Sequence, residues 1–190
     1  MVSTRNCHRF LEEYSEIMPD TISHFEGRYL SLCEIDDWEF ATRPNSTAVV
    51  GILAMTPENE VILVEQFRRP VQARVLEMCA GLVGDEPEFA GESLVDTARR
   101  ELLEETGYTS ESITPLLSSP TSAGMTDEIT HLFFAENATK SGPGGGVGGE
   151  DITTHLVPFS DLASFLKKSQ RNGLLIDFKI HAALAALNLM

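Results

Sequence analysis

The 190-residue sequence has little positive charge and no long apolar run. Fourteen Lys and Arg stand against 29 Asp and Glu, which gives a formal net charge of −15. The chain therefore lacks the clustered cations that bind a nucleic-acid backbone or an anionic membrane surface. Its longest apolar runs, residues 48–55 and 182–187, are too short to cross a bilayer. We expect neither nucleic acid nor a membrane as a partner.

Cysteine is also scarce. Cys7, Cys33 and Cys79 are far apart and form no CxxC pair, so the sequence encodes neither a disulfide framework nor a zinc ribbon. The N-terminal residues are charged and lack the apolar segment of a signal peptide. These features predict a protein of the reducing cytoplasm.

The hydrophobic periodicity predicts both strands and helices. We expect strands at 25–33, 38–42, 48–55, 61–67, 75–78, 113–117, 129–135 and 152–157, and helices at 7–18, 93–106, 158–169 and 176–189. Helices fall both in the middle and at the end of a chain in which strands are more numerous. This order predicts an α/β protein whose mixed sheet lies between helices. We expect an N-terminal helical extension over 1–24 and one domain over 25–190.

The helix predicted at 93–106 carries three glutamates on one face. Glu101, Glu104 and Glu105 stand at positions i, i+3 and i+4. Like charges at this spacing cost about 0.2–0.5 kcal/mol per pair. A Mg²⁺ ion would offset that cost, because it takes carboxylate ligands and leaves the rest of its shell to water and substrate phosphate. Taken alone, the triplet also fits a solvated acidic helix face.

The stretch from Gly81 to Tyr108 resembles the signature of the Nudix hydrolases, G-x5-E-x7-R-E-U-x-E-E-x-G-U, where U is a bulky apolar residue. From Glu92 onward every position matches, except that Tyr108 stands at the final U. Upstream, ten residues instead of five separate Gly81 from Glu92, and the extra residues fall in a loop, where insertion costs little. The resemblance implies a Nudix fold, with a mixed β-sheet between helices (α/β/α).

The resemblance also implies a metal site. Its ligands would be three carboxylates and one backbone carbonyl, from Glu101, Glu104, Glu105 and Ala80. Glu105 would also serve catalysis through the metal, which would be Mg²⁺ or, alternatively, Mn²⁺. Glu92 and Arg100 would form a structural salt bridge that joins the preceding loop to the helix and orients the metal ligands.

Outside the signature, the chain resembles the ADP-ribose and nucleoside-diphosphate-sugar pyrophosphatases over about residues 25–189. The resemblance is carried by residues 38–40, 65–68 and 76–82, and it implies substrate contacts from Trp38, Arg68, Arg69, Glu77 and Glu128. An indole face suits a nucleobase, and guanidinium groups suit phosphate. Trp38 would equally suit a core or a dimer contact, and Arg74 is a further candidate for phosphate.

The residues around the signature bear on the substrate. Relatives specific for ADP-ribose carry a proline sixteen residues after the glycine that corresponds to Gly107, where this chain has Ala123. Residues 79–83 and the glycine-rich run look most like the UDP-glucose pyrophosphatase subgroup. The resemblance thus implies a homodimer that hydrolyses nucleoside diphosphate sugars, such as UDP-glucose or ADP-ribose, to a nucleoside monophosphate and a sugar phosphate. The alternatives are a non-hydrolytic nucleotide-sugar sensor and a Nudix enzyme for dinucleoside polyphosphates.

Residues 141–149 contain six glycines and predict a flexible loop. No Gly-Lys-Ser/Thr follows them, so a P-loop is not expected. We interpret the segment as a mobile flap that carries Glu150 and Asp151 toward the metals; the alternative is a surface loop with solvated acids. Related enzymes often use a glutamate of this loop as the general base. Glu150 is therefore the first candidate, Asp151 the second and Glu128 the third.

Overall fold

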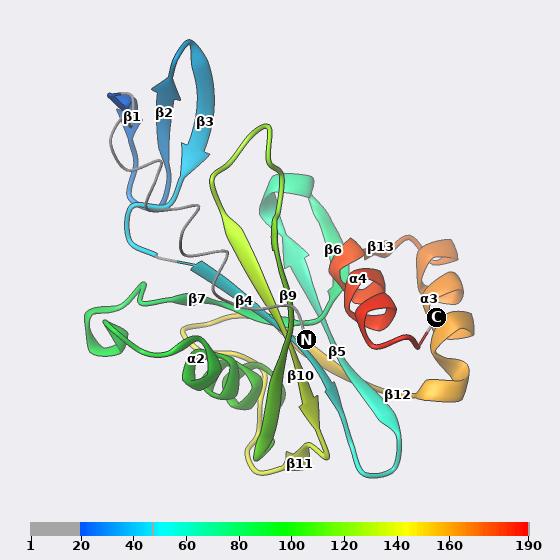
Figure 1. The fold of residues 1–190 in the computed structure, drawn as a ribbon. Helices are drawn as coiled ribbons and strands as arrows, with labels where there is room; N and C mark the ends of the chain where they lie inside the picture. The colour runs from blue at the N-terminus through cyan, green and yellow to red at the C-terminus, as the bar shows by residue number, and fades with distance from the viewer. Residues whose placement is uncertain (1–19, 47, 190) are drawn as a thin grey trace. The chain divides into compact units, whose positions relative to one another are not determined.

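The computed structural model describes residues 20–46 and 48–189, which fall into two compact units (Figure 1). The first unit ends at Pro44 and includes Ser122–Asp127, and the second holds Asn45–Thr121 and the chain from Glu128 onward. The helix predicted at 7–18 lies outside the described residues, and the boundary predicted at residue 24 stays a prediction. Within the described ranges, no helix has the length and apolar character needed to span a membrane.

The first unit contains an antiparallel sheet in the order β1-β2-β3. Its strands are β1 (Ile22–Glu26), β2 (Ser31–Ile35) and β3 (Trp38–Thr42). The single strand predicted at 25–33 is wrong, because the N–H of Gly27 donates to the carbonyl of Leu30 at 2.8 Å and closes a hairpin turn. Because this turn contains apolar residues, the hydrophobic periodicity did not reveal it. A second hairpin turn lies at Asp36-Asp37, and both residues have the positive φ of a type I′ turn, 51° and 63°.

The second unit is built on an eight-stranded mixed sheet. Its strands are β4 (Ala48–Met55), β5 (Glu60–Arg68), β6 (Ala73–Glu77), β7 (Cys79–Val83), β9 (Ser112–Pro120), β10 (Ile129–Glu136), β12 (Thr153–Pro158) and β13 (Leu175–Ile176). The order is β13-β6-β5-β4-β10-β9, with β12 paired to β5 and β7 paired to β4. The pairs β4–β10 and β6–β13 are parallel, so the predicted mixed sheet is confirmed.

Three α-helices are described in this unit, α2 (Leu94–Glu101), α3 (Leu162–Arg171) and α4 (Phe178–Ala186). The helix predicted at 93–106 begins where the Ser93 side chain accepts the Asp96 N–H, and it ends at Gly107, which has a φ of 74°. Its last five residues, Leu102–Thr106, form a π-helical turn. An apolar stripe of period 3.6 does not reveal such a turn, which often occurs at functional sites.

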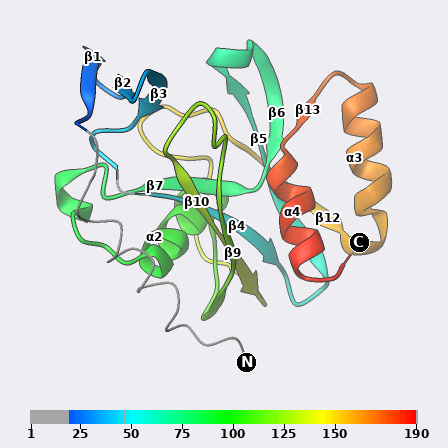
Figure 2. The ribbon, with the colours of Figure 1, turned by 45° about the horizontal axis from the view of Figure 1, so that its top comes forward.

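Alternate residues of β4 face two separate cores, and this alternation places the helices in two layers. Ile52 packs in one cluster with Leu102, the first residue of the π-helical turn after α2, and Leu53 packs in the other with Ile180 and Leu184 of α4. Figures 1 and 2 show α2 on one side of the sheet and α3 with α4 on the other. The expected α/β/α layering is therefore present.

Two pairings that the sequence did not predict hold the signature helix in place. β7 runs along β4, with Ala80 opposite Gly51, in a stretch where the sequence predicted no strand. The short strands β8 (Tyr108–Thr109) and β11 (Thr139–Lys140) pair antiparallel. The first pairing puts a strand beside the glutamates, and the second brings the start of the glycine-rich loop to the end of the helix.

Candidate active site

Glu105 lies where the π-helical turn meets β7, and it is only 6% exposed. Its Oε2 accepts a hydrogen bond from the Ala80 N–H at 3.2 Å, and its carboxylate also accepts from the Cys79 thiol. Burial raises the pKa of Glu105 to about 8 against these two donors, and the negative charges of Glu101 and Glu150 add to the rise. The structure thus holds this carboxyl group in place but leaves its negative charge poorly compensated.

Glu101 also packs against β7. A Cβ at Gly81 would lie 2.0 Å from the Cδ of Glu101, so this position of β7 has no room for a side chain. Burial raises the pKa of Glu101 to about 7; the Arg100 guanidinium opposes the rise, and the nearby charge of Glu104 adds to it. The signature glycine therefore permits the close approach that buries Glu101.

Arg100 joins the loop before the helix to the glutamates on it. Its Nε and Nη2 each donate to Glu92 Oε2 at 3.2 Å, so the ion pair implied by the resemblance is present. Nη1 donates to Glu101 Oε1 at 2.8 Å and to Glu104 Oε2 at 3.2 Å. The guanidinium also lies 4.0 Å from the ring centroid of Phe89. Its role in orienting metal ligands stays a prediction.

This donor set fits a hard divalent cation. Glu101, Glu104 and Glu105 supply only carboxylate oxygens, the ligand type that Mg²⁺ prefers. Two of the three have raised pKa values because they are buried together, and Arg100 is the cation that contacts the group in the described structure. A further positive charge would therefore be bound favourably here. The contribution of the Ala80 carbonyl stays a prediction.

The first part of the glycine-rich loop caps the end of this helix. The N–H of Gly145 donates to the Glu105 carbonyl at 2.8 Å, and the N–H of Gly146 donates to the Glu104 carbonyl at 3.0 Å. A Cβ at Gly144 would lie 2.4 Å from the carbonyl carbon of Thr106, so this glycine is required by close backbone packing. Residues 144–146 thus serve as a cap, and a flap motion would begin after them.

The two acids at the end of this loop have different surroundings. The Glu150 carboxylate accepts from the Val147 N–H at 3.0 Å, and its charge contributes to the raised pKa of Glu105. The Asp151 side chain is 85% exposed and pairs with Nη1 of Arg74 on β6 at 3.3 Å. Glu150 is therefore coupled to the carboxylate cluster, whereas Asp151 is bound to an arginine. The choice of general base between these two acids stays a prediction.

Two of the expected substrate contacts bind each other. Arg68 Nε donates to Glu77 Oε2 at 2.7 Å. Glu77 is buried, and burial raises its pKa although Arg68 opposes the rise. Arg69 is exposed just after β5. Glu128 Oε1 accepts from Thr121 Oγ1 at 3.1 Å.

Trp38 is the expected site residue that lies in the first unit. Its indole N–H donates to the Gly124 carbonyl at 3.3 Å, and its side chain is 63% exposed. It borders a cavity of about 390 Å³ within that unit, lined by Ile35, Trp38, Phe40, Ala123, Thr126 and Asp127. An indole so exposed is not a core residue, and its ring is accessible for stacking.

Sequence reasoning missed two contacts of the carboxylates. Cys79 packs in the core cluster beside Ala80, and its thiol also donates to Glu105, which no sequence pattern indicates. Phe89 packs on Arg100 from the loop upstream of Glu92, and no spacing rule in the sequence marks it.

Comparisons with known proteins concern the same part of the chain. The NUDIX domain family model matches residues 45–177. The ADP-ribose pyrophosphatase of Bacillus subtilis is 45% identical over 89 residues, which are 46% of this chain but only 44% of that relative. The GDP-mannose pyrophosphatase of Cronobacter sakazakii is 33% identical over 160 residues, 80% of this chain and 77% of that protein. A crystal structure described as an ADP compounds hydrolase has a TM-score of 0.68 over 89% of this chain and 90% of its own, at 17% identity, which bears on the fold alone.

Proposed function

The chain belongs to the Nudix family, and from this membership we propose that it hydrolyses the diphosphate linkage of nucleoside diphosphate sugars. The products are a nucleoside monophosphate and a sugar phosphate. The observation that carries the proposal is the placement of the three signature glutamates beside β7: Glu105 is buried against Ala80, Glu101 packs on Gly81, and Glu104 shares the Arg100 guanidinium with Glu101. The relatives named for ADP-ribose and GDP-mannose support the substrate class, and UDP-glucose is included because of the subgroup that the sequence resembles.

The three glutamates would hold a divalent cation, with Mg²⁺ as the first candidate and Mn²⁺ as the alternative. When bound, the cation neutralises the diphosphate and lowers the pKa of the attacking water. Arg100 holds Glu101 and Glu104 on one side of the helix, while Ala80 and Cys79 hold Glu105. These contacts restrict each carboxylate before substrate arrives, which lowers the entropic cost of assembling the site.

Glu150 accepts the proton of the attacking water in this proposal, since its charge already acts on Glu105. The Nε of Arg68 is occupied by Glu77, so its two terminal nitrogens are the ones directed to a phosphate oxygen, and the exposed Arg69 assists. Glu77 thereby positions Arg68.

The nucleobase stacks on Trp38 in this proposal. Ala123, which stands where ADP-ribose-specific relatives carry proline, lines the same cavity of about 390 Å³. A small side chain beside an exposed indole leaves the shape of the cavity permissive. We therefore infer a hydrolase that accepts several nucleoside diphosphate sugars.

A hydrolysis panel tests the proposal. Purified protein with Mg²⁺ is offered ADP-ribose, GDP-mannose, UDP-glucose and diadenosine polyphosphates, and the products are separated by anion-exchange chromatography. We expect monophosphate and sugar phosphate from the first three. Glu105→Gln should abolish turnover, whereas Glu111→Gln, an exposed glutamate with the same change of charge, should leave it intact. Binding without hydrolysis would identify a sensor and overturn the proposal.

The role of the loop acid is tested by a second pair of variants. Glu150→Gln should lower kcat far more than it raises KM, and Asp151→Asn should change both only slightly. The opposite result would move the general base to Asp151. Light scattering of the same preparations tests the expected homodimer.

A further inference from the structure

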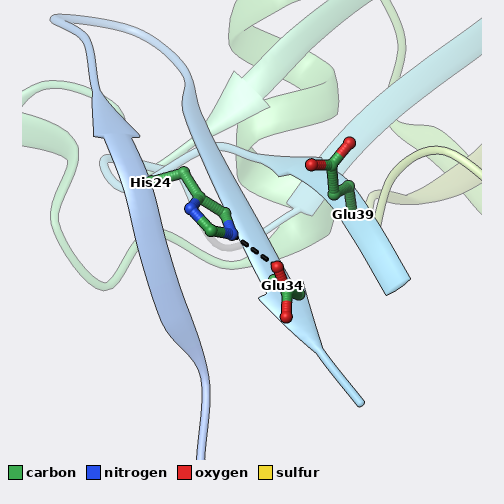
Figure 3. Close-up of side chains that lie close together, drawn as sticks. All are labelled: His24, Glu34 and Glu39. Atoms are coloured by element: carbon green, nitrogen blue, oxygen red, sulfur yellow. Dashed lines mark hydrogen bonds and ion pairs between the residues drawn. The ribbon is translucent and has the colours of Figure 1, made fainter. Parts of the chain in front are cut away.

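The three-stranded sheet carries a second group of metal-ligating side chains, outside the signature. His24, Glu34 and Glu39 come one from each of β1, β2 and β3, and their side chains lie close together (Figure 3). His24 Nε2 and Glu34 Oε2 are 2.6 Å apart. One ligand atom from each of the three residues lies within 4.8 Å of the others. All three residues belong to the first unit.

A β-bulge brings His24 into this group. Between the pairs Ser23–Cys33 and Phe25–Leu32, β1 has one residue more than β2, and that residue is His24. Bulges take a side chain out of the regular alternation of a strand and aim it in a new direction. Here the imidazole is aimed at the Glu34 carboxylate.

The two glutamates face each other across an antiparallel pair. Glu34 and Glu39 are register partners in the β2–β3 ladder. Like charges directly opposite each other destabilise a sheet. A cation bound between the two carboxylates would convert this repulsion into attraction, and the adjacent imidazole would supply a third ligand.

We propose that His24, Glu34 and Glu39 form a binding site for a first-row transition cation such as Zn²⁺ or Co²⁺. An imidazole nitrogen suits Zn²⁺, Co²⁺ and their neighbours, whereas Mg²⁺ prefers oxygen ligands throughout. Three protein ligands leave a coordination position open, and the exposure of His24 and Glu39 makes the site accessible from solvent. Its donor chemistry separates this site from the all-carboxylate cluster on the signature helix.

Trp38 provides a local reporter, because it is the single tryptophan of the sequence and precedes Glu39 in β3. Metal-free full-length protein is first given excess Mg²⁺ and then titrated with Co²⁺, which quenches indole fluorescence at short range. We expect saturable quenching with one Co²⁺ per chain, and calorimetry should give the same stoichiometry. His24→Gln and Glu39→Gln should each weaken binding at least about tenfold, because each removes one of three ligands.

Two control variants distinguish this site from non-specific binding of the cation and from the carboxylate cluster. Glu26→Gln removes one charge from exposed β1 outside the group and should leave the titration unchanged. Glu105→Gln alters the carboxylate cluster and should also leave the quenching unchanged. The proposal is overturned if His24→Gln and Glu26→Gln titrate alike, or if Glu105→Gln abolishes the quenching. Circular dichroism checks the fold of each variant. If His24→Gln fails to fold, Glu39→Gln at an exposed position provides the test.

Discussion

Replacing Glu105 by Gln should stabilise the metal-free protein at neutral pH, although it removes a proposed metal ligand. Burial raises the pKa of Glu105 from 4.5 to about 8, so the folded chain holds a proton that the unfolded chain releases. An acid of this kind costs stability progressively as the pH rises through that window, and it costs nothing below 4.5. Gln carries no charge, so it is free of this penalty.

The size of the effect follows from the pH interval in which Glu105 is ionised in the unfolded chain but protonated in the folded chain. Each pKa unit corresponds to about 1.36 kcal/mol. At pH 7 the interval runs from 4.5 to 7, which gives about 3 kcal/mol, and at pH 5 it gives less than about 1 kcal/mol. Gln Oε1 can still accept the Ala80 N–H, so the variant keeps that hydrogen bond.

Thermal unfolding of chelator-treated protein between pH 5 and pH 8 measures the effect. For a chain of this size, 1 kcal/mol shifts Tm by about 2–4 °C, so Glu105→Gln should melt about 6–12 °C above the wild type at pH 7. At pH 5 the difference should fall to about 2 °C. Glu111→Gln changes the net charge equally at an exposed position and controls for long-range repulsion.

Two results would refute this reasoning. One is a variant that melts at or below the wild-type temperature at pH 7, and the other is an advantage that is equal at pH 5 and pH 7. In either case burial would not raise the pKa of the Glu105 carboxyl as this reasoning requires. If Glu111→Gln raised Tm by the same amount, the stabilisation would result from the change in net charge and not from the burial of Glu105.

Three further predictions follow from the same contacts. Arg100→Lys should lower the free energy of unfolding in urea by about 1–3 kcal/mol, because an ammonium group cannot bridge the loop glutamate and the helix together; an unchanged midpoint would contradict this. Gly144→Ala and Gly149→Ala both place alanine at positive φ, which costs about 1–2 kcal/mol, but only Gly144 has backbone within 2.4 Å of the new Cβ. Gly144→Ala should therefore be clearly the more destabilising in the same assay, and equal losses would exclude the cap. Adding Mg²⁺ to metal-free protein should raise Tm more at pH 8 than at pH 6, because the ion displaces protons from its carboxylate ligands; an equal rise would exclude these ligands.

The spacing of residues in the sequence was sufficient to predict the features that depend on residues close together in the chain. The i, i+3, i+4 spacing placed Glu101, Glu104 and Glu105 together at the end of one helix. The helix begins at Ser93 and ends at Gly107 as the sequence predicted, because a cap side chain and a left-handed glycine act within one turn. The signature likewise identified the family, since it records local chemistry position by position.

Contacts between distant residues were decided only by the tertiary structure. Ala80 and Glu105 are 25 residues apart in the sequence. Their contact depends on β7, which was not predicted because this segment forms a strand only through its pairing with β4. Burial against that strand turns a row of surface-like glutamates into carboxyl groups with raised pKa values. The bulge that turns His24 toward Glu34 is likewise a property of strand pairing, which a single strand's sequence does not encode. The sequence alone therefore determined that Glu101, Glu104 and Glu105 share one helix face, and the fold decided how far burial raises the pKa values of Glu101 and Glu105.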